Sequence, residues 1–359
     1  MQDLNQQPSQ LNVAVGLIVR DGQVLIAWRD NSKHQGGRYE FSGGKVDAGE
    51  SVPTALAREL AEELGIQVHT CRFVRRLHYR YPEKTVCLHV YRVDQFRGEP
   101  HGAEGQPVKW VAPAELWQYQ FPDANRPILR AAQLPDLYTI SHDVSVFNPN
   151  LSKSFHSILP SPPLKKEGTP PFLKGGGGIL KDQLISTGYN ALENWLAYHT
   201  QNVAPDAWLY VRVPTLVLDA QPALIQQLHQ QRPDLKLVIS AALYELNLPV
   251  AGYHLRHADL AVYTALPRHD ERQLWFASVH DAASIQAADA LGVDAMLLGA
   301  VLSTQSHPEQ AGIGWQTFAQ LAGLSNCPVY ALGGQSAATL ATAQQHAGYG
   351  VAGIRGMLA

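Results

Sequence analysis

The chain has 359 residues, 45% of them hydrophobic, and a formal net charge of −3 with neutral histidines. This length exceeds one ordinary domain and allows two, and the apolar content is enough for sizeable cores. The small negative charge gives no bulk attraction to a nucleic-acid polymer, so a free nucleotide is the more compatible partner. The sequence holds no run of about 18 apolar residues, so no membrane span or membrane partner is expected. The composition leaves the oligomeric state open.

The three cysteines, Cys71, Cys87 and Cys327, are widely spaced. An odd number with this spacing favours reduced thiols over a disulfide framework, and therefore a cytoplasmic setting. Residues 1–7 are polar and do not resemble a signal peptide, which agrees with that expectation.

The first predicted elements are two strands, residues 11–16 and 23–28, on either side of Asp21-Gly22. An Asp-Gly pair between two apolar runs is typical of a β-hairpin. Because such turns are common, this pattern indicates a hairpin and nothing more specific.

A helix is predicted over residues 54–64, where good helix formers are followed by Gly65 as a stop signal. Leu56, Leu60 and Leu64 recur every four residues and form the predicted buried stripe.

Glu59, Glu62 and Glu63 share another face of this helix, because residues three and four apart are neighbours. Like charges repel at this spacing unless a cation neutralises them. Clustered carboxylate oxygens suit Mg²⁺ or Mn²⁺, which in turn suit phosphate substrates. The alternative is a solvated acidic surface that binds no metal.

The wider pattern distinguishes these interpretations. Five residues separate Gly44 from Glu50, and seven more precede Arg-Glu-Leu-x-Glu-Glu-x-Gly-Ile at residues 58–66. This resembles the Nudix box, the signature of hydrolases that cleave nucleoside diphosphates linked to another group. The resemblance implies an α/β/α sandwich with a mixed sheet.

The resemblance also implies roles for the matched residues. Gly43 and Gly44 would shape the loop that enters the helix, with Gly43 also at the metal. Arg58 would hold a box glutamate by a charged hydrogen bond. Four carboxylates would bind Mg²⁺, or Mn²⁺, or orient its ligands: Glu50, Glu59, Glu62 and Glu63. The metal would polarise a phosphoryl oxygen and activate water, while a carboxylate of the cluster takes the proton.

Three further segments, residues 39–45, 102–107 and 121–127, make the first domain similar to the MutT branch of the family. This resemblance covers about residues 10–132. It implies a phosphoanhydride hydrolase that converts 8-oxo-dGTP to the monophosphate and pyrophosphate, which cleanses the nucleotide pool and limits mutation. Gly44 and Lys45 are then expected among the substrate-binding residues. Ser42 departs from the proline usual in this branch and should loosen the loop slightly.

The same resemblance implies how the base is recognised. Asn125 would read the oxidised guanine edge, since a side-chain amide offers a donor and an acceptor together. Phe41 would line the base pocket, and Arg29 would lie near the base or the phosphates. Glu104 would be a distal metal ligand or base. Simpler alternatives are a turn-forming role for Asn125, a core position for Phe41 and an exposed position for Glu104.

Residues 144–182 are rich in proline, glycine and lysine and lack periodicity, so they are predicted to be disordered. Residues 137–140, just before them, read as a strand of the second domain. The predicted domains are therefore residues 1–135 and 136–359, with the insert in the loop after the first strand of the second domain.

The second domain is predicted to be a parallel (β/α)₈ barrel, because strand and helix patterns alternate. The predicted strands are residues 137–140, 209–213, 237–240, 252–255, 275–279, 295–299, 329–332 and 351–354. The predicted helices include residues 281–291, 315–322 and 337–346.

Five segments look like thiamin phosphate synthase and its TenI relatives: residues 250–255, 277–280, 299–304, 331–334 and 353–356. This resemblance covers roughly residues 136–358 and implies phosphate binding by loops after the late strands. There the glycines would let backbone N–H groups approach an anion, and Arg355 would add charge. The glycines are Gly333, Gly334, Gly353 and Gly356. The alternative for such glycines is turn geometry alone.

Departures from that family argue against synthase activity. Only Arg212 remains of its Gln-x-Arg-x-Lys stretch, and Ser240 and Ala241 stand at its Asn-Asp pair. These losses remove charge stabilisation of a diphosphate leaving group. His280 matches the strand-end histidine with which TenI-type thiazole tautomerases transfer protons. The alternative is a hydrogen-bonded structural histidine.

Three hypotheses follow for the whole chain. The first is a Mg²⁺-dependent 8-oxo-dGTP hydrolase joined to a barrel that binds a phosphate ligand. The second is a first domain that cleaves a thiamin-pathway diphosphate beside a barrel of synthase or tautomerase type. The third treats the barrel as a non-catalytic binding module.

Overall fold

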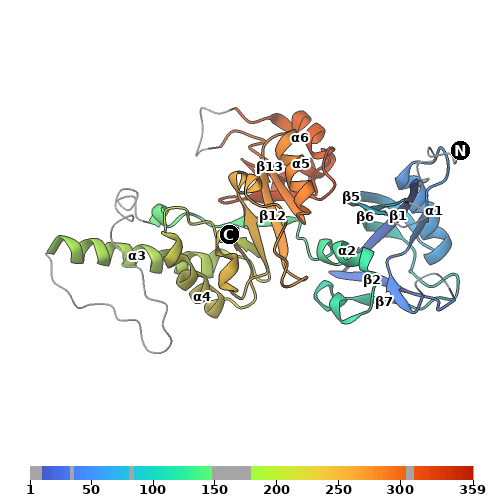
Figure 1. Ribbon diagram of the computed structural model, residues 1–359, viewed down its shortest axis with the longest axis horizontal. Helices are drawn as coiled ribbons and strands as arrows, with labels where there is room; N and C mark the ends of the chain where they lie inside the picture. Colours follow the sequence, from blue (N-terminus) through green and yellow to red (C-terminus); the bar gives the residue numbers. More distant parts are fainter. Residues whose placement is uncertain (1–9, 33–35, 81–84, 148–178, 305–310, 359) are drawn as a thin grey trace, which may run out of the picture.

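The computed structural model describes residues 10–32, 36–80, 85–147, 179–304 and 311–358. An N-terminal domain built on a mixed sheet packs beside a C-terminal closed barrel (Figure 1). This architecture confirms the predicted α/β class with a barrel as the second unit. None of the described helices is long and apolar enough to cross a membrane.

The N-terminal sheet is ordered β3-β2-β1-β6-β5, with β4 paired to β1 and β7 to β2. Its strands are β1 (Gln10–Arg20), β2 (Gln23–Arg29), β3 (Arg38–Glu40), β4 (Gly43–Lys45), β5 (Gln67–Arg80), β6 (Thr85–Arg97) and β7 (Val108–Val111). The pair β1–β6 is parallel and the other pairs are antiparallel, so the sheet is mixed. The predicted hairpin is confirmed, with φ of 51° at Asp21 and 73° at Gly22, the region that a tight two-residue turn requires.

One long helix, α1 (Val52–Leu64), carries Glu59, Glu62 and Glu63. The Ser51 side chain caps its first turn by accepting from Thr54 N, and Gly65 ends it with a φ of 67°. The predicted stripe of Leu56, Leu60 and Leu64 is fully buried. Three short helices precede the barrel: η1 (Pro113–Gln118), η2 (Asp123–Asn125) and α2 (Arg126–Ala131).

The barrel closes in the order β10-β11-β12-β13-β14-β15-β8-β9, and every neighbouring pair is parallel. Its strands are β8 (Leu137–Ile140), β9 (Trp208–Tyr210), β10 (Lys236–Ser240), β11 (Gly252–Leu255), β12 (Leu274–Val279), β13 (Ala295–Gly299), β14 (Val329–Leu332) and β15 (Gly350–Gly353). All eight predicted strands are confirmed, although β9 ends three residues before the predicted end.

The helices of the barrel include α3 (Ile179–Asn202), α4 (Gln221–Gln231), α5 (Ala282–Leu291), α6 (Gly314–Ala322) and α7 (Leu340–Gln345). Shorter 3₁₀ segments are η3 (Val144–Phe147), η6 (Leu218–Ala220), η7 (Ala241–Leu246), η8 (His257–Ala261) and η9 (Ala337–Thr339). The helix predicted over residues 337–346 thus begins as the 3₁₀ turn η9 and becomes α-helical only at Leu340.

The prediction of disorder was wrong at both ends of the insert. Residues 144–147 form η3, because Val144 is fully buried in the barrel core and η3 packs on α3. Helix α3 already begins at Ile179. The middle of the predicted insert, residues 148–178, lies outside the described residues.

The barrel meets the N-terminal domain with the amino ends of its strands. Edge strand β5 donates a backbone hydrogen bond from Arg76 N to the carbonyl of Asn326, just before β14. Helix α2 lies between the sheet and the barrel (Figure 1). One buried apolar cluster runs through both units, from Val74 and Leu129 to Phe276 and Tyr330. The carboxyl ends of the barrel strands therefore point away from the N-terminal domain.

Candidate active site

The acidic face of α1 lies against β4, and two glycines of β4 make this approach possible. Gly43 N donates to the Glu63 carboxylate at 3.2 Å. A Cβ atom at Gly44 would overlap the Glu59 carboxyl group, so only glycine leaves that carboxylate its position. Strand β4 therefore helps to position two of the three predicted helix carboxylates. It holds Glu63 by a hydrogen bond and leaves room for Glu59.

Arg58 links the glutamates around the entrance of the helix. Its guanidinium donates to Glu59 at 2.8 Å, to Glu50 at 3.1 and 3.2 Å, and to the Lys45 carbonyl at 3.0 Å. These hydrogen bonds raise the pKa of Arg58 and lower that of Glu50. Glu62 lies 3.5 Å from the same guanidinium but is 60% exposed. Arg58 thus compensates Glu50 and Glu59 more closely than Glu62.

Glu63 has three like-charged neighbours, Glu40, Glu59 and Glu104, and these four residues form an acidic cluster. Burial raises its pKa, and Glu40, Glu104 and Glu59 raise it further, so that it reaches about 7 despite the hydrogen bond from Gly43 N. This is the response of a carboxylate that has acidic neighbours and too little solvent.

The acidic cluster fits a hard divalent cation, since all four residues offer carboxylate oxygens. Within the described ranges, however, no three acidic, histidine or cysteine side chains are already arranged to close on a metal ion. Glu63, Glu59 and Glu104 would therefore have to change side-chain position to hold Mg²⁺ together.

A pocket of about 300 Å³ opens beside the acidic cluster. Its walls are supplied by β2, β3, α1 and the loop before β7, through Ala27, Trp28, Asp30, Ser32, Glu40, Glu63, Glu104, Gly105, Gln106 and Pro107. Arg29 lies at the same end of β2 and pairs with Glu40 at 2.6 Å. The pocket therefore brings the predicted Glu63 and Glu104 together, with a cationic side chain at its edge.

Sequence reasoning missed Glu40 and Gln106. Gln106 donates to the Glu63 carbonyl at 2.8 Å and accepts from Glu104 N at 2.9 Å, so it ties the Glu104 loop to the end of α1. Both residues lie inside segments already noted for their family resemblance, at residues 39–45 and 102–107. That position was the one signal that pointed to them.

The residues expected to recognise the base lie on a separate group of elements. Phe41 is 5% exposed and stacks on Phe121, with 5.3 Å between ring centroids. Asn125 is half-buried at the end of η2, where α2 begins. Tyr79 of β5 donates to the neighbouring Ala124 carbonyl at 2.9 Å. The segment 121–125 is thus held by the core on one side and by β5 on the other.

The candidate residues of the barrel gather at the carboxyl ends of β12 to β15. His280 donates from Nδ1 to the Gly299 carbonyl at 2.9 Å, so Nε2 is the ring nitrogen that this hydrogen bond does not use. Gly333 and Gly334 have φ of 94° and 66°, a region that favours glycine. Gly356 joins the same loops through a bridge to Ser336, and Arg355 beside it is exposed.

Comparison with known proteins identifies the two units. Residues 10–132 match the NUDIX domain family, and residues 219–357 match the thiamine monophosphate synthase family. The 8-oxo-dGTP diphosphatase of Escherichia coli K12 is 36% identical over 121 residues, which are 33% of this chain and 94% of that protein. The chain belongs to the Nudix family. Nudix hydrolases generally use divalent metals such as Mg²⁺.

Other relatives of the Nudix domain differ in the substrate they are named for. The 8-oxo-dGTP diphosphatase of Haemophilus influenzae is 39% identical over 120 residues, covering 33% of this chain and 88% of that protein. The CTP pyrophosphohydrolase of E. coli K12 is 37% identical over 121 residues, covering 34% and 90%. The N-terminal domain is therefore a Nudix hydrolase like the 8-oxo-dGTP diphosphatases, and identity alone does not choose the nucleobase.

Proposed function

We propose that this protein hydrolyses 8-oxo-dGTP to the monophosphate and pyrophosphate with Mg²⁺, in the cytoplasm. Such a reaction removes an oxidised precursor before DNA replication, limits mutation and spares DNA repair. The proposal rests on the acidic cluster of Glu63, Glu59, Glu40 and Glu104 beside the pocket. Repulsion between the carboxylates makes such a cluster unfavourable by itself. A divalent cation that also binds a phosphate chain would remove this repulsion.

The roles of the residues follow from their positions. Bound Mg²⁺, or Mn²⁺, would supply a Lewis acid for the phosphoryl group and lower the pKa of water. Glu59, Glu63 and Glu104 would hold the cation, with Glu62 at its exposed side. Arg58 would keep Glu59 in place through their 2.8 Å hydrogen bond. A carboxylate of this group would accept the proton of the attacking water.

Substrate choice would depend on further residues of the N-terminal domain. Arg29 and Lys45 would contact the phosphates, since both are cationic; Arg29 pairs with Glu40, and Lys45 follows Gly44 on β4. Asn125 would read the purine edge through its amide, with the Phe41–Phe121 stack forming the floor of the base site. CTP is the second candidate substrate, because the similarity to the CTP pyrophosphohydrolase is as high.

A phosphate-release screen tests this proposal. The full-length protein is assayed with 8-oxo-dGTP, dGTP, CTP and thiamin diphosphate, with and without Mg²⁺. The proposal expects the highest kcat/KM for 8-oxo-dGTP, and a loss of that preference in Asn125→Ala. A preference for CTP or for thiamin diphosphate, unchanged in Asn125→Ala, would contradict it.

For the barrel we propose a phosphate-binding role at Gly333, Gly334, Gly356 and Arg355, within a unit spanning residues 136–359. The supporting observations are the two positive φ angles and the convergence of these loops with His280. Calorimetry with thiazole phosphate and thiamin phosphate tests it. Binding without turnover supports a module, whereas turnover that is lost in His280→Ala supports a tautomerase; no binding of either ligand would contradict the proposal.

A further inference from the structure

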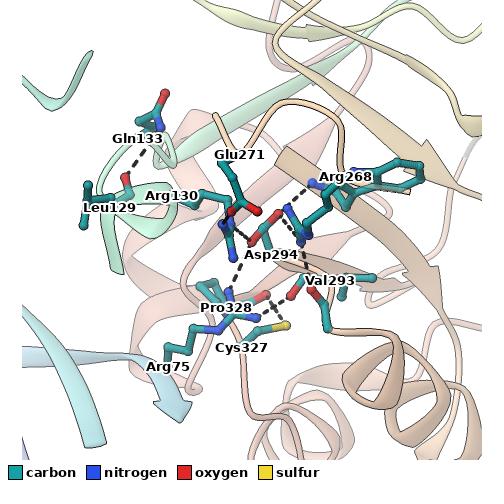
Figure 2. A network of polar contacts seen from close by, with 12 residues as sticks. Arg75, Leu129, Arg130, Gln133, Arg268, Glu271, Val293, Asp294, Cys327 and Pro328 are labelled. Atoms are coloured by element: carbon teal, nitrogen blue, oxygen red, sulfur yellow. Dashed lines mark hydrogen bonds and ion pairs between the residues drawn. The ribbon is translucent and has the colours of Figure 1, made fainter. Parts of the chain in front are cut away.

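A buried ion network joins the Nudix domain to the barrel (Figure 2). Its centre is Asp294, just before β13, whose side chain is 0% exposed. Asp294 accepts from Arg130 of α2 at 2.8 Å, from Arg75 of β5 at 3.4 Å and from Arg268 of the barrel at 2.9 Å. Two of these arginines come from the N-terminal domain, so the network crosses the boundary between the two units.

The network contains three guanidinium groups and two carboxylates, Asp294 and Glu271. Arg130 contacts both carboxylates, because its NH1 group also donates to Glu271 at 2.8 Å. The Arg130 side chain is 8% exposed. A buried arginine held by two carboxylates has a single favourable position, because leaving either partner unpaired is costly. The barrel therefore fixes the place and orientation of α2.

Helix α2 in turn carries the segment proposed to read the base. Asn125 is the residue directly before α2, and Arg130 lies five residues further along the chain. Ile128 and Leu129 of the same helix are buried, so the helix is packed into the core on both sides of the junction. A shift of Arg130 would be transmitted to Asn125 through less than two turns of helix.

The same segment is supported from β5. Tyr79 holds the Ala124 carbonyl, and Arg75 and Arg76 on that strand donate to Val293, Asp294 and Asn326 of the barrel. Residues 121–125 are thus attached to two elements, α2 and β5, and both elements are tied to the barrel. The acidic residues of α1, by contrast, are held by β4 and Arg58 and make none of these contacts.

We infer that the barrel serves as a scaffold that positions Asn125, with Arg130 as the positioning residue. The inference rests on the proposed role of Asn125 in nucleotide selection. It assigns to the barrel a task in the Nudix reaction that needs no chemistry at the barrel's own loops. It also separates two functions: base selection depends on the barrel, and phosphoanhydride cleavage depends on α1.

The test compares kcat and KM for 8-oxo-dGTP and dGTP in the full-length protein and in Arg130→Met. The selectivity ratio, kcat/KM for 8-oxo-dGTP divided by that for dGTP, should fall roughly 2- to 30-fold, the range expected for a residue that acts through another. The loss should lie mainly in KM for 8-oxo-dGTP. In an Asn125→Ala background, Arg130→Met should change the ratio no further, since coupled residues are not additive.

Arg232→Met is the matched control. Arg232 also pairs with an aspartate, Asp234 at 2.7 Å, and donates to the Thr200 and Val203 carbonyls, but all of these lie within the barrel. This variant removes a similar number of hydrogen bonds and should keep the ratio. An equal fall in Arg232→Met would show a general stability effect and would overturn the inference, as would an unchanged ratio in folded Arg130→Met.

Glu271→Gln covers the case in which Arg130→Met does not fold. Its side chain is 42% exposed, so the substitution removes one partner of Arg130 without burying a new group. A smaller fall in the ratio is expected, and an unchanged ratio overturns the inference. The wild-type ratio checks the proposed function separately: a value near one refutes 8-oxo-dGTP selection, and the comparison then uses the best substrate of the screen and its nearest analogue.

Discussion

The Nudix site and the η8 turn that follows β11 of the barrel differ in how their acidic groups are compensated. In the Nudix domain Glu63 is surrounded by other carboxylates, and its pKa rises to about 7 through burial and through these neighbours. At the mouth of the barrel, Asp259 forms a two-pronged ion pair with Arg256 at 2.8 and 3.1 Å. Burial alone would raise the pKa of Asp259, but Arg256 lowers it below its ordinary value. Glu63 has like-charged neighbours and forms no ion pair within the part of the chain that the structure describes, which suits a cation from outside, whereas Asp259 already has its cationic partner.

The largest expected effect concerns Glu63 in the acidic cluster of the Nudix domain. Glu63→Gln should lower kcat/KM for the nucleotide by roughly 10²- to 10⁴-fold, a range typical for loss of a group in general acid–base catalysis. The fold should persist, because an amide relieves the like-charge crowding. Steady-state kinetics with circular dichroism measures both.

Asp259→Asn is the matched control for that substitution. It removes a carboxylate that the barrel already compensates, so nucleotide hydrolysis should stay at the wild-type rate. If folded Glu63→Gln retained full activity, or if Asp259→Asn were equally impaired, the contrast between the two sites would be wrong.

The next effect concerns the junction of the two regions. Asp294→Asn leaves two buried arginines and the partly buried Arg268 without their shared anion and should cost about 3–5 kcal/mol of unfolding free energy. Asp234→Asn, at the half-exposed pair with Arg232, should cost at most about 1 kcal/mol. Urea denaturation of both variants gives the difference, and equal costs would contradict a special role of the junction.

The pH dependence of stability follows from the same group. Burial alone would raise the pKa of Asp294, but Arg268, Arg130 and Arg75 together bring it below its ordinary value. A depressed carboxyl pKa stabilises the fold at pH above the unfolded value of about 3.9, and this stabilisation is lost as the pH falls through the folded value. The wild type should therefore lose more stability below pH 4 than Asp294→Asn does.

A smaller effect distinguishes position from charge in the acidic site. In Gly44→Ala the new Cβ atom displaces the Glu59 carboxylate, which is the movable end of a side chain. Activity should fall about 10²-fold, as expected for a displacement near 1 Å in an active site, while the melting temperature barely changes. Gly323→Ala, whose Cβ atom would make ordinary contacts, serves as the control. Full activity in Gly44→Ala would show that the position of Glu59 is not required.

The smallest expected effect concerns the N-terminal cap of α1, the helix that carries the carboxylates. Ser51 caps α1 by accepting from Thr54 N, so Ser51→Ala should cost about 1 kcal/mol of stability. The carboxylates themselves stay in place, and kcat should change little. A urea midpoint equal to that of the wild type would mean that the cap contributes nothing.

Local patterns were enough to predict the first hairpin, helix α1 and the strands of the barrel. The four-residue spacing of Leu56, Leu60 and Leu64 defined α1, and short apolar runs defined the eight barrel strands. These signals lie within a few residues of one another, so no tertiary contact is needed to find them. The insert was misplaced at its ends because a proline- and glycine-rich composition outweighed the single buried Val144.

The junction, in contrast, was invisible in the sequence. Arg130 and Asp294 are 164 residues apart and Arg75 and Asp294 are 219 apart, and each alone is an ordinary charged residue. Glu40 escaped notice for a similar reason, since only the pairing of β2 with β3 brings it beside Glu63. Contacts between distant elements carry no periodicity, so they appear only in the folded chain.

The most direct test of the central claim is a metal titration during turnover. Pyrophosphate release from 8-oxo-dGTP by the full-length protein is followed after chelation of divalent ions and then as Mg²⁺ or Mn²⁺ is added. The account predicts no release after chelation, recovery with either ion, and a weaker apparent metal affinity in Glu63→Gln. Release that persists after chelation, or a metal response that Glu63→Gln leaves unchanged, would contradict it.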